Sequence, residues 1–153
     1  MRILLIDDTK KHREAGLAEL TALGHEVVAT DNYESVLAMR PEALASFDVV
    51  LLDLLMPTEY CGALGGAGLE FLGQPFAIGY VLSVHLARSG IRHTAVATDM
   101  NHHHHPAASL MDTVSGSFQV NGNRILWTHA PMKDVDGVRV KDWSAVLTRV
   151  LTT

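Results

Sequence analysis

The sequence has little cysteine, no long hydrophobic run and no excess of basic residues, and each deficit excludes a class of protein. The one cysteine, Cys61, cannot form a disulfide within the chain, so we expect a reducing, cytoplasmic location. The longest apolar run, 49–57, is interrupted by Asp53 and is too short to span a bilayer. The chain has 12 Lys and Arg against 17 Asp and Glu, and this acidic balance argues against direct nucleic-acid binding.

The remaining composition is that of a folded globular protein. The chain has 153 residues, of which 48% are hydrophobic and 19% are charged, and this is enough for one sizeable core. The apolar start of the chain meets Asp7 and Asp8 after six residues, so we expect no secretory signal peptide. We find no internal repeat and no linker, and therefore expect a single domain over 1–153.

Strand and helix signals alternate along the first half of the chain. Leu17, Leu20 and Leu23 recur on one side of a helix that Gly24 can end. Strands are expected at 2–6, 26–30 and 49–52, and helices at 10–23 and, with a break at Pro41, at 33–47. This alternation in short units predicts a parallel sheet with helices on both faces.

The second half adds a fourth and a fifth strand and a clear final helix. Asn121-Gly122 between two short apolar runs predicts an extra hairpin before the fifth strand. Asp142 can cap the final helix, whose apolar residues follow a helical stripe. The expected helices are 76–89, 106–114 and 143–151, and the expected strands are 92–98, 117–120 and 124–128.

Three carboxylates follow two of the expected central strands. Asp7 and Asp8 end the first strand, and Asp53 ends the third. The carboxyl ends of central parallel strands meet at one edge of a doubly wound sheet, so these groups are expected to share a pocket. Close like charges repel, and a divalent cation with oxygen ligands relieves that repulsion. The alternative is that all three are solvated residues at the starts of loops.

These residues resemble a known motif set. Ile6-Asp7-Asp8, the D-x-x-M-P run at 53–57 and Ala97-Thr98 after a strand are similar to the receiver domain of two-component response regulators, of the chemotaxis-regulator type. The resemblance implies a flavodoxin-like, doubly wound sheet of five parallel strands in the order 2-1-3-4-5. With the local signals, we expect an enlarged loop after the third strand and the extra hairpin before the fifth.

The resemblance also implies a role for each matching residue. Asp53 would be the phosphoacceptor, and Thr98 would be the switch hydroxyl that turns toward the phosphoryl group. Mg²⁺ would be held by Asp7, Asp8 and Asp53 together with the backbone carbonyl of Leu55.

The resemblance is incomplete at the end of the fifth strand. The family has a lysine directly before a proline there, whereas Ala130 precedes Pro131 in this chain. Lys133 stands two residues after the proline, and His129 stands one residue before Ala130. Either side chain can supply a cation to the pocket, so both assignments stay open.

Three further segments differ from the family pattern. Asp99 follows Thr98 where the family prefers a small residue, and a second charge there opposes phosphate entry. The glycine-rich segment 61–73 has no Gly-Lys-Ser/Thr and is expected to be an insertion rather than a phosphate loop. The histidine run 102–105 is expected to be a polar loop, with binding of a borderline metal as the alternative.

The expected function is a single receiver in a phosphorelay. A histidine kinase or phosphotransfer protein would phosphorylate Asp53 in the presence of Mg²⁺, and a downstream target protein would read the result. No enzyme activity is expected beyond the receiver's own phosphorylation and dephosphorylation chemistry. The alternatives are a degenerate receiver that only binds partners, an aspartyl phosphohydrolase, which Leu55 disfavours at the position of its second acid, and a flavodoxin-type cofactor binder.

Overall fold

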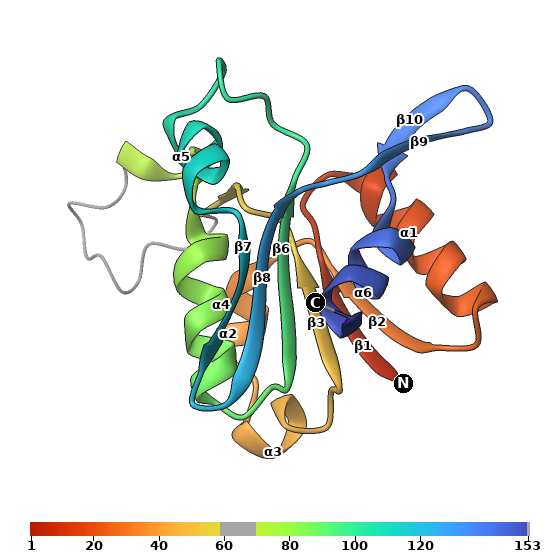
Figure 1. The fold of residues 1–153 in the computed structure, drawn as a ribbon, viewed down its shortest axis with the longest axis vertical. Helices are drawn as coiled ribbons and strands as arrows, with labels where there is room; N and C mark the ends of the chain where they lie inside the picture. Colours follow the sequence, from red (N-terminus) through yellow and green to blue (C-terminus); the bar gives the residue numbers. More distant parts are fainter. Residues whose placement is uncertain (59–69, 153) are drawn as a thin grey trace.

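A parallel sheet forms the centre of the molecule. The computed structural model describes residues 1–58 and 70–152. Five parallel strands lie in the order β2, β1, β3, β6 and β8, as the resemblance implied, and β7 adds an antiparallel edge (Figure 1). Their bounds are β1 Arg2–Ile6, β2 Glu26–Thr30, β3 Val49–Leu52, β6 His93–Thr98, β7 Gly116–Val120 and β8 Asn123–His129.

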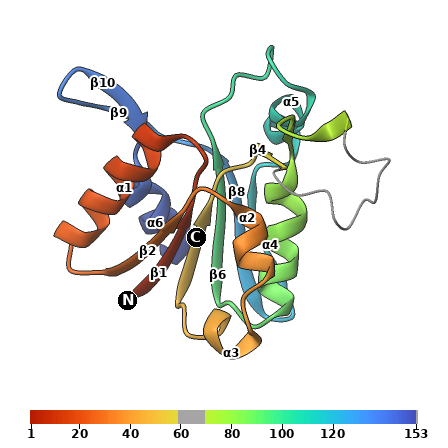
Figure 2. The same ribbon diagram turned by 180° about the vertical axis from the view of Figure 1, so that it is seen from behind.

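Helices cover both faces of this sheet. One face carries α1 (Lys10–Ala22) and α6 (Trp143–Thr152). The other carries α2 (Tyr33–Leu37), α4 (Ile78–Arg88) and α5 (Pro106–Val114), while the short α3 (Pro41–Leu44) lies near the start of β3 (Figure 2). This confirms the doubly wound α/β class. Over the described ranges, no helix has both the length and the apolar character needed to cross a bilayer.

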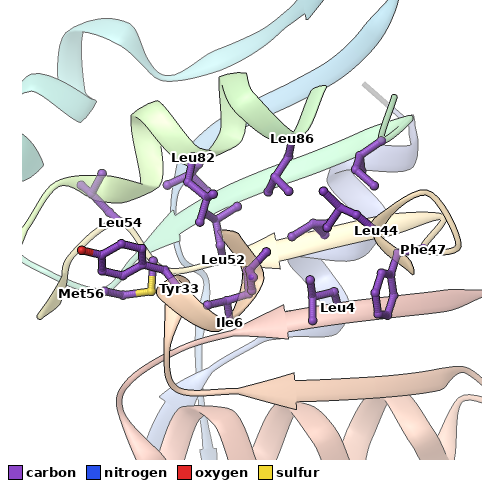
Figure 3. Close-up of a cluster of buried hydrophobic side chains, with 14 of the residues drawn as sticks. Leu4, Ile6, Tyr33, Leu44, Phe47, Leu52, Leu54, Met56, Leu82 and Leu86 are labelled. Carbon is purple, nitrogen blue, oxygen red and sulfur yellow. The ribbon is translucent and has the colours of Figure 1, made fainter. Parts of the chain in front are cut away.

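The alternation of side chains along the strands builds two cores. Leu4, Ile6 and Leu52 point to one face, where Leu82 and Leu86 of α4 pack on them (Figure 3). The intervening strand residues point to the other face and pack against α1 and α6, because successive strand residues face opposite sides. The second core comprises Ile3, Leu5, Leu20, Val49, Leu51, Ala95, Ala97, Leu126, Trp143, Val146, Leu147 and Val150.

Two hairpins extend the fold beyond the five parallel strands. The expected one joins β7 to β8 through Asn121-Gly122, whose φ angles are 53° and 80°. The second was not expected: β9 (Met132–Val135) pairs with β10 (Val138–Lys141) through Asp136-Gly137, with φ angles of 50° and 79°. This hairpin leaves the end of β8, projects beside α1 and returns to the start of α6 (Figure 1).

The segment after β3 contains a short pair of strands. β4 (Met56–Pro57) pairs antiparallel with β5 (Pro75–Phe76). The expected enlarged loop and glycine-rich insertion fall largely on 59–69, which lie outside the described residues, as does Cys61.

The start of α4 sits directly against the backbone that follows β3. A Cβ at Gly79 would lie 2.5 Å from the carbonyl oxygen of Asp53 and 2.8 Å from the Cα of Leu54. The Gly79 N–H also donates to the Leu54 carbonyl at 3.0 Å. A glycine at this position therefore allows the helix to pack close to the turn that carries Asp53.

Gly79→Ala should destabilise the protein by about 1–3 kcal/mol, because the new methyl group meets rigid backbone rather than a movable side chain. Urea unfolding of the variant measures this loss. Val81→Ala on the same helix is the control, since Val81 is exposed and its truncation should change stability by less than about 0.5 kcal/mol. Equal effects at the two positions would contradict the packing account.

Candidate functional site

The three expected carboxylates do meet at the carboxyl edge of the sheet. One ligand oxygen from each of Asp7, Asp8 and Asp53, the acidic cluster, lies within 4.8 Å of the others. Asp7 and Asp53 are buried, and Asp8 is the most accessible of the three. The ends of β1 and β3 are neighbours in the sheet, so their parallel pairing explains this meeting.

Backbone hydrogen bonds orient the two buried carboxylates. The Thr9 N–H donates to Asp7 Oδ1 at 2.9 Å, and the Leu54 N–H donates to Asp53 Oδ1 at 2.7 Å. The guanidinium of Arg13, on α1, donates to the Asp7 carbonyl at 2.7 Å and so fixes the turn after β1. Both carboxylates are thus held by their own loops.

A lysine that the sequence analysis did not identify occupies the centre of the site. The Nζ of Lys141 lies 2.8 Å from Asp53 Oδ1, 3.1 Å from Asp7 Oδ2 and 3.3 Å from Asp99 Oδ1, and its side chain is 0% exposed. It also lies 5.5 Å from the ring centroid of Trp143, within cation–π range. A buried ammonium needs such partners, because burial without them is very costly.

This placement corrects the expected position of the cation. Lys133 forms an ion pair with Glu19 of α1, and His129 Nε2 lies 2.6 Å from Asp112 Oδ1. Both side chains are therefore engaged away from the acidic cluster. The chain turns outward into β9 after β8, and the end of β10 brings a cation, Lys141, to the pocket.

A signal for this arrangement was present in the sequence. Asp136-Gly137 between Val135 and Val138 has the same form as the Asn121-Gly122 turn and predicts a hairpin by the same rule. A hairpin at this point returns the chain to the carboxyl ends of the parallel strands. Lys141, which comes shortly before the final helix, then lies at these strand ends.

Thr98 and Leu55 both lie at the carboxyl edge of the sheet, and the roles expected for them stay predictions. Thr98 ends β6 and is 1% exposed, and its Oγ1 accepts the Met100 N–H at 3.1 Å. Leu55 is buried two residues beyond Asp53. The Thr98 hydroxyl therefore holds the start of the loop that carries Asp99 and the histidine run.

The histidine run is tied to α5. His102 Nδ1 lies 3.2 Å from Asp112 Oδ2 on α5, and His102 Nε2 lies 2.8 Å from His103 Nε2. His105 caps the helix, because its Nδ1 accepts the Ala107 N–H at 3.1 Å. These contacts give the run a part in holding its own loop, in keeping with the expected polar loop.

Burial and charge shift the protonation of the site. Burial raises the pKa of Asp53 to about 7 against the pull of Lys141, and burial with the charge of Asp7 raises the pKa of Asp8. Burial alone would lower the pKa of Lys141, but Asp53, Asp7 and Asp99 together raise it above its ordinary value. The lysine is therefore charged at neutral pH.

The chemistry of the cluster fits a hard divalent cation. Asp7, Asp8, Asp53 and Asp99 contribute four carboxylates, and Lys141 balances only one of them. Mg²⁺ prefers carboxylate and water oxygens and uses few protein ligands, as the acidic cluster would supply. Asp7, Asp8 and Asp53 are the residues that can hold it.

Asp53→Asn should change how stability depends on pH when no divalent cation is present. The pKa of Asp53 is about 7 in the folded protein against an ordinary 3.8, so the folded state binds more protons between these values. Wild-type stability from this group is therefore lost as pH rises, by up to about 1.4 kcal/mol per pH unit. As pH rises across this window, the free energy of unfolding of Asp53→Asn, measured with urea, should increase relative to that of wild type. A stability difference that stays constant from about pH 4 to about pH 7 would contradict this assignment.

Comparison with known sequences gives no match for this chain. No family model matches it. No curated protein matches it either.

Comparison with solved structures does give matches. A response regulator from Desulfuromonas acetoxidans is similar with a TM-score of 0.53 and 17% identity, over 98% of this chain and 95% of that one. The non-phosphorylated HemR receiver domain from Leptospira biflexa is similar with a TM-score of 0.52 and 18% identity, over 99% of this chain and 94% of that one. At these identities the likeness establishes architecture, and this chain has the fold of a response-regulator receiver domain.

Proposed function

We propose that this protein is a response-regulator receiver that accepts a phosphoryl group on Asp53. The observation that carries the proposal is the contact between Asp53 and the buried ammonium of Lys141, inside an acidic cluster at the carboxyl edge of a receiver fold. An acceptor carboxylate, carboxylates for a divalent cation and a fixed lysine are the groups that phosphoryl transfer requires.

The chain's own residues would perform most of the transfer. An Asp53 carboxylate oxygen attacks phosphorus, an acyl phosphate forms, and the bond to the donor's leaving group breaks. Mg²⁺, when bound at the acidic cluster, would offset charge on the transferring group and favour ionised Asp53. Lys141 would donate to a phosphoryl oxygen in place of one of its present carboxylate partners.

The same proposal gives Thr98 and Leu55 their roles. The Thr98 hydroxyl would leave the Met100 N–H and turn to the phosphoryl group, drawing the loop after β6 toward Asp53. The Leu55 carbonyl would complete the protein's ligands for Mg²⁺. Asp7, Asp8 and Asp53 would supply the others.

The proposed partners follow from this chemistry. The donor would be a histidine kinase or a phosphotransfer protein, and a downstream protein would read the altered surface. The loop after β6 leads into α5, and α5 is joined to the end of β8 through Asp112 and His129. A movement of the Thr98 hydroxyl would therefore alter the surface formed by α5 and the end of β8.

A degenerate receiver remains the second candidate because of Asp99. Lys141 already has three carboxylate partners, one for each N–H of its ammonium, and Asp99 is one of them. A phosphoryl group must displace one of these. If none yields, the protein would keep a receiver surface without accepting phosphate.

Intact mass spectrometry after treatment with Mg²⁺ and a small phosphodonor tests the proposal. Wild type should gain one phosphoryl group, Asp53→Asn should gain none, and Asp8→Ala should label at least about tenfold more slowly because metal binding weakens. Labelling of Asp53→Asn at the wild-type rate would remove Asp53 from the role. A wild type that binds Mg²⁺ but never labels would support the degenerate receiver.

Lys141→Met should bind Mg²⁺ about tenfold more tightly, because the ammonium and the metal compete for the same carboxylates. Isothermal titration calorimetry measures the affinity. Lys133→Met is the matched control, since that lysine pairs with Glu19 instead, and its Mg²⁺ affinity should equal that of wild type. Weaker Mg²⁺ binding by Lys141→Met would show that the lysine supports the metal rather than opposing it.

A further inference from the structure

The lysine of the site is carried by an element outside the main sheet. Among the residues that the structure describes, β10 pairs with β9 alone, in a separate two-stranded sheet, and Lys141 is its last residue. The Asp142 N–H donates to the Pro131 carbonyl at 2.7 Å and closes the base of the hairpin. The pairing of β1 with β3, which brings Asp7 and Asp53 together, therefore does not position Lys141.

His12 of α1 binds the backbone of this lysine. Its side chain is 1% exposed, and its Nδ1 lies 3.1 Å from the Lys141 backbone nitrogen, which can only donate. Nδ1 must then be the acceptor, so the ring hydrogen of a neutral imidazole is on Nε2. That nitrogen lies 3.1 Å from Asp99 Oδ2 and donates to it. Both ring nitrogens are thus assigned by their partners.

Asp99 completes a closed set of contacts around the lysine. One carboxylate oxygen accepts from His12, and the other lies 3.3 Å from Lys141 Nζ. Lys141 is therefore held at two points, at its backbone by His12 and at its ammonium by Asp99. Asp99, which the sequence alone suggested as an unfavourable charge beside the pocket, thus helps to fix the position of Lys141.

We propose that His12 and Asp99 are positioning residues that hold Lys141 of the β9–β10 hairpin at Asp53. The expected effect on phosphorylation rests on the proposed function. The contacts of His12 and Asp99 with Lys141 do not depend on it. Lysine has a long, flexible side chain. The pairing of Lys141 with Met132 fixes its backbone to β9, but β9 and β10 lie outside the six-stranded sheet that carries Asp7 and Asp53. His12 ties the Lys141 backbone to α1, and Asp99 limits the conformations of the Lys141 side chain.

Three substitutions of His12 separate the two hydrogen bonds. His12→Asn keeps an acceptor near the Nδ1 position and loses the donor to Asp99. His12→Gln keeps a donor near the Nε2 position and loses the acceptor for the Lys141 N–H. His12→Phe keeps the ring volume and loses both. His85→Gln, at an exposed position on α4, is the control.

The readouts are the phosphorylation rate and the ¹H–¹⁵N signal of the Lys141 ammonium. In wild type this signal should be observable at neutral pH, because a buried ammonium with three acceptors exchanges slowly with water. His12→Phe should lose the signal and be phosphorylated about tenfold more slowly. His12→Asn and His12→Gln should each keep part of the signal and part of the phosphorylation rate. Asp99→Ala should lose the signal while keeping the far-UV spectrum of the fold.

The outcomes separate this inference from the proposed function. If wild type never labels but the ammonium signal disappears in His12→Phe, the positioning role stands and the phosphoryl transfer fails. If the His12→Phe protein is folded and keeps both the signal and the wild-type rate, the positioning role is overturned. Should that variant fail to fold, Asp99→Ala decides, and retention of its ammonium signal overturns the role.

Discussion

The buried contact of Lys141 with Asp53, Asp7 and Asp99 is the interaction on which the site depends. Without an ammonium at this point, like charges from β1, β3 and β6 would meet in a space largely closed to water. With it, the charges are partly balanced and one carboxylate, Asp53, stays beside a donor that a phosphoryl group could use. The remaining negative charge makes the acidic cluster suited to a divalent cation.

This constraint explains the form of the second hairpin. The chain leaves β8 without a lysine at the strand end, extends through β9, and turns at Asp136-Gly137 to bring Lys141 back. α1 then has two roles: it covers one face of the sheet, and it offers His12 to the returning strand. The hairpin thus places a cation from a distant part of the chain against the strand ends.

Much of the fold follows from local patterns in the sequence. Short apolar runs separated by amphipathic helices predict the parallel sheet, and Asn121-Gly122 predicts the antiparallel edge. The pair Asp7-Asp8 and the single Asp53 could be identified because they directly follow β1 and β3. Lys141 could not be found by its distance from a proline, because the hairpin separates it from β8. His12 gave no signal, since its role depends on contacts of α1 with Asp99, after β6, and with Lys141 of β10, which form only in the folded chain.

A crystal structure with Mg²⁺ and beryllofluoride, which mimics a phosphoryl group on a carboxylate, tests the central claim most directly. The account predicts beryllofluoride on Asp53, Mg²⁺ bound by the acidic cluster, and Lys141 Nζ within hydrogen-bond distance of a fluorine while His12 still binds the Lys141 backbone. A complex in which Lys133 or His129 reaches the fluorines, with Lys141 still held by its three carboxylates, would contradict it.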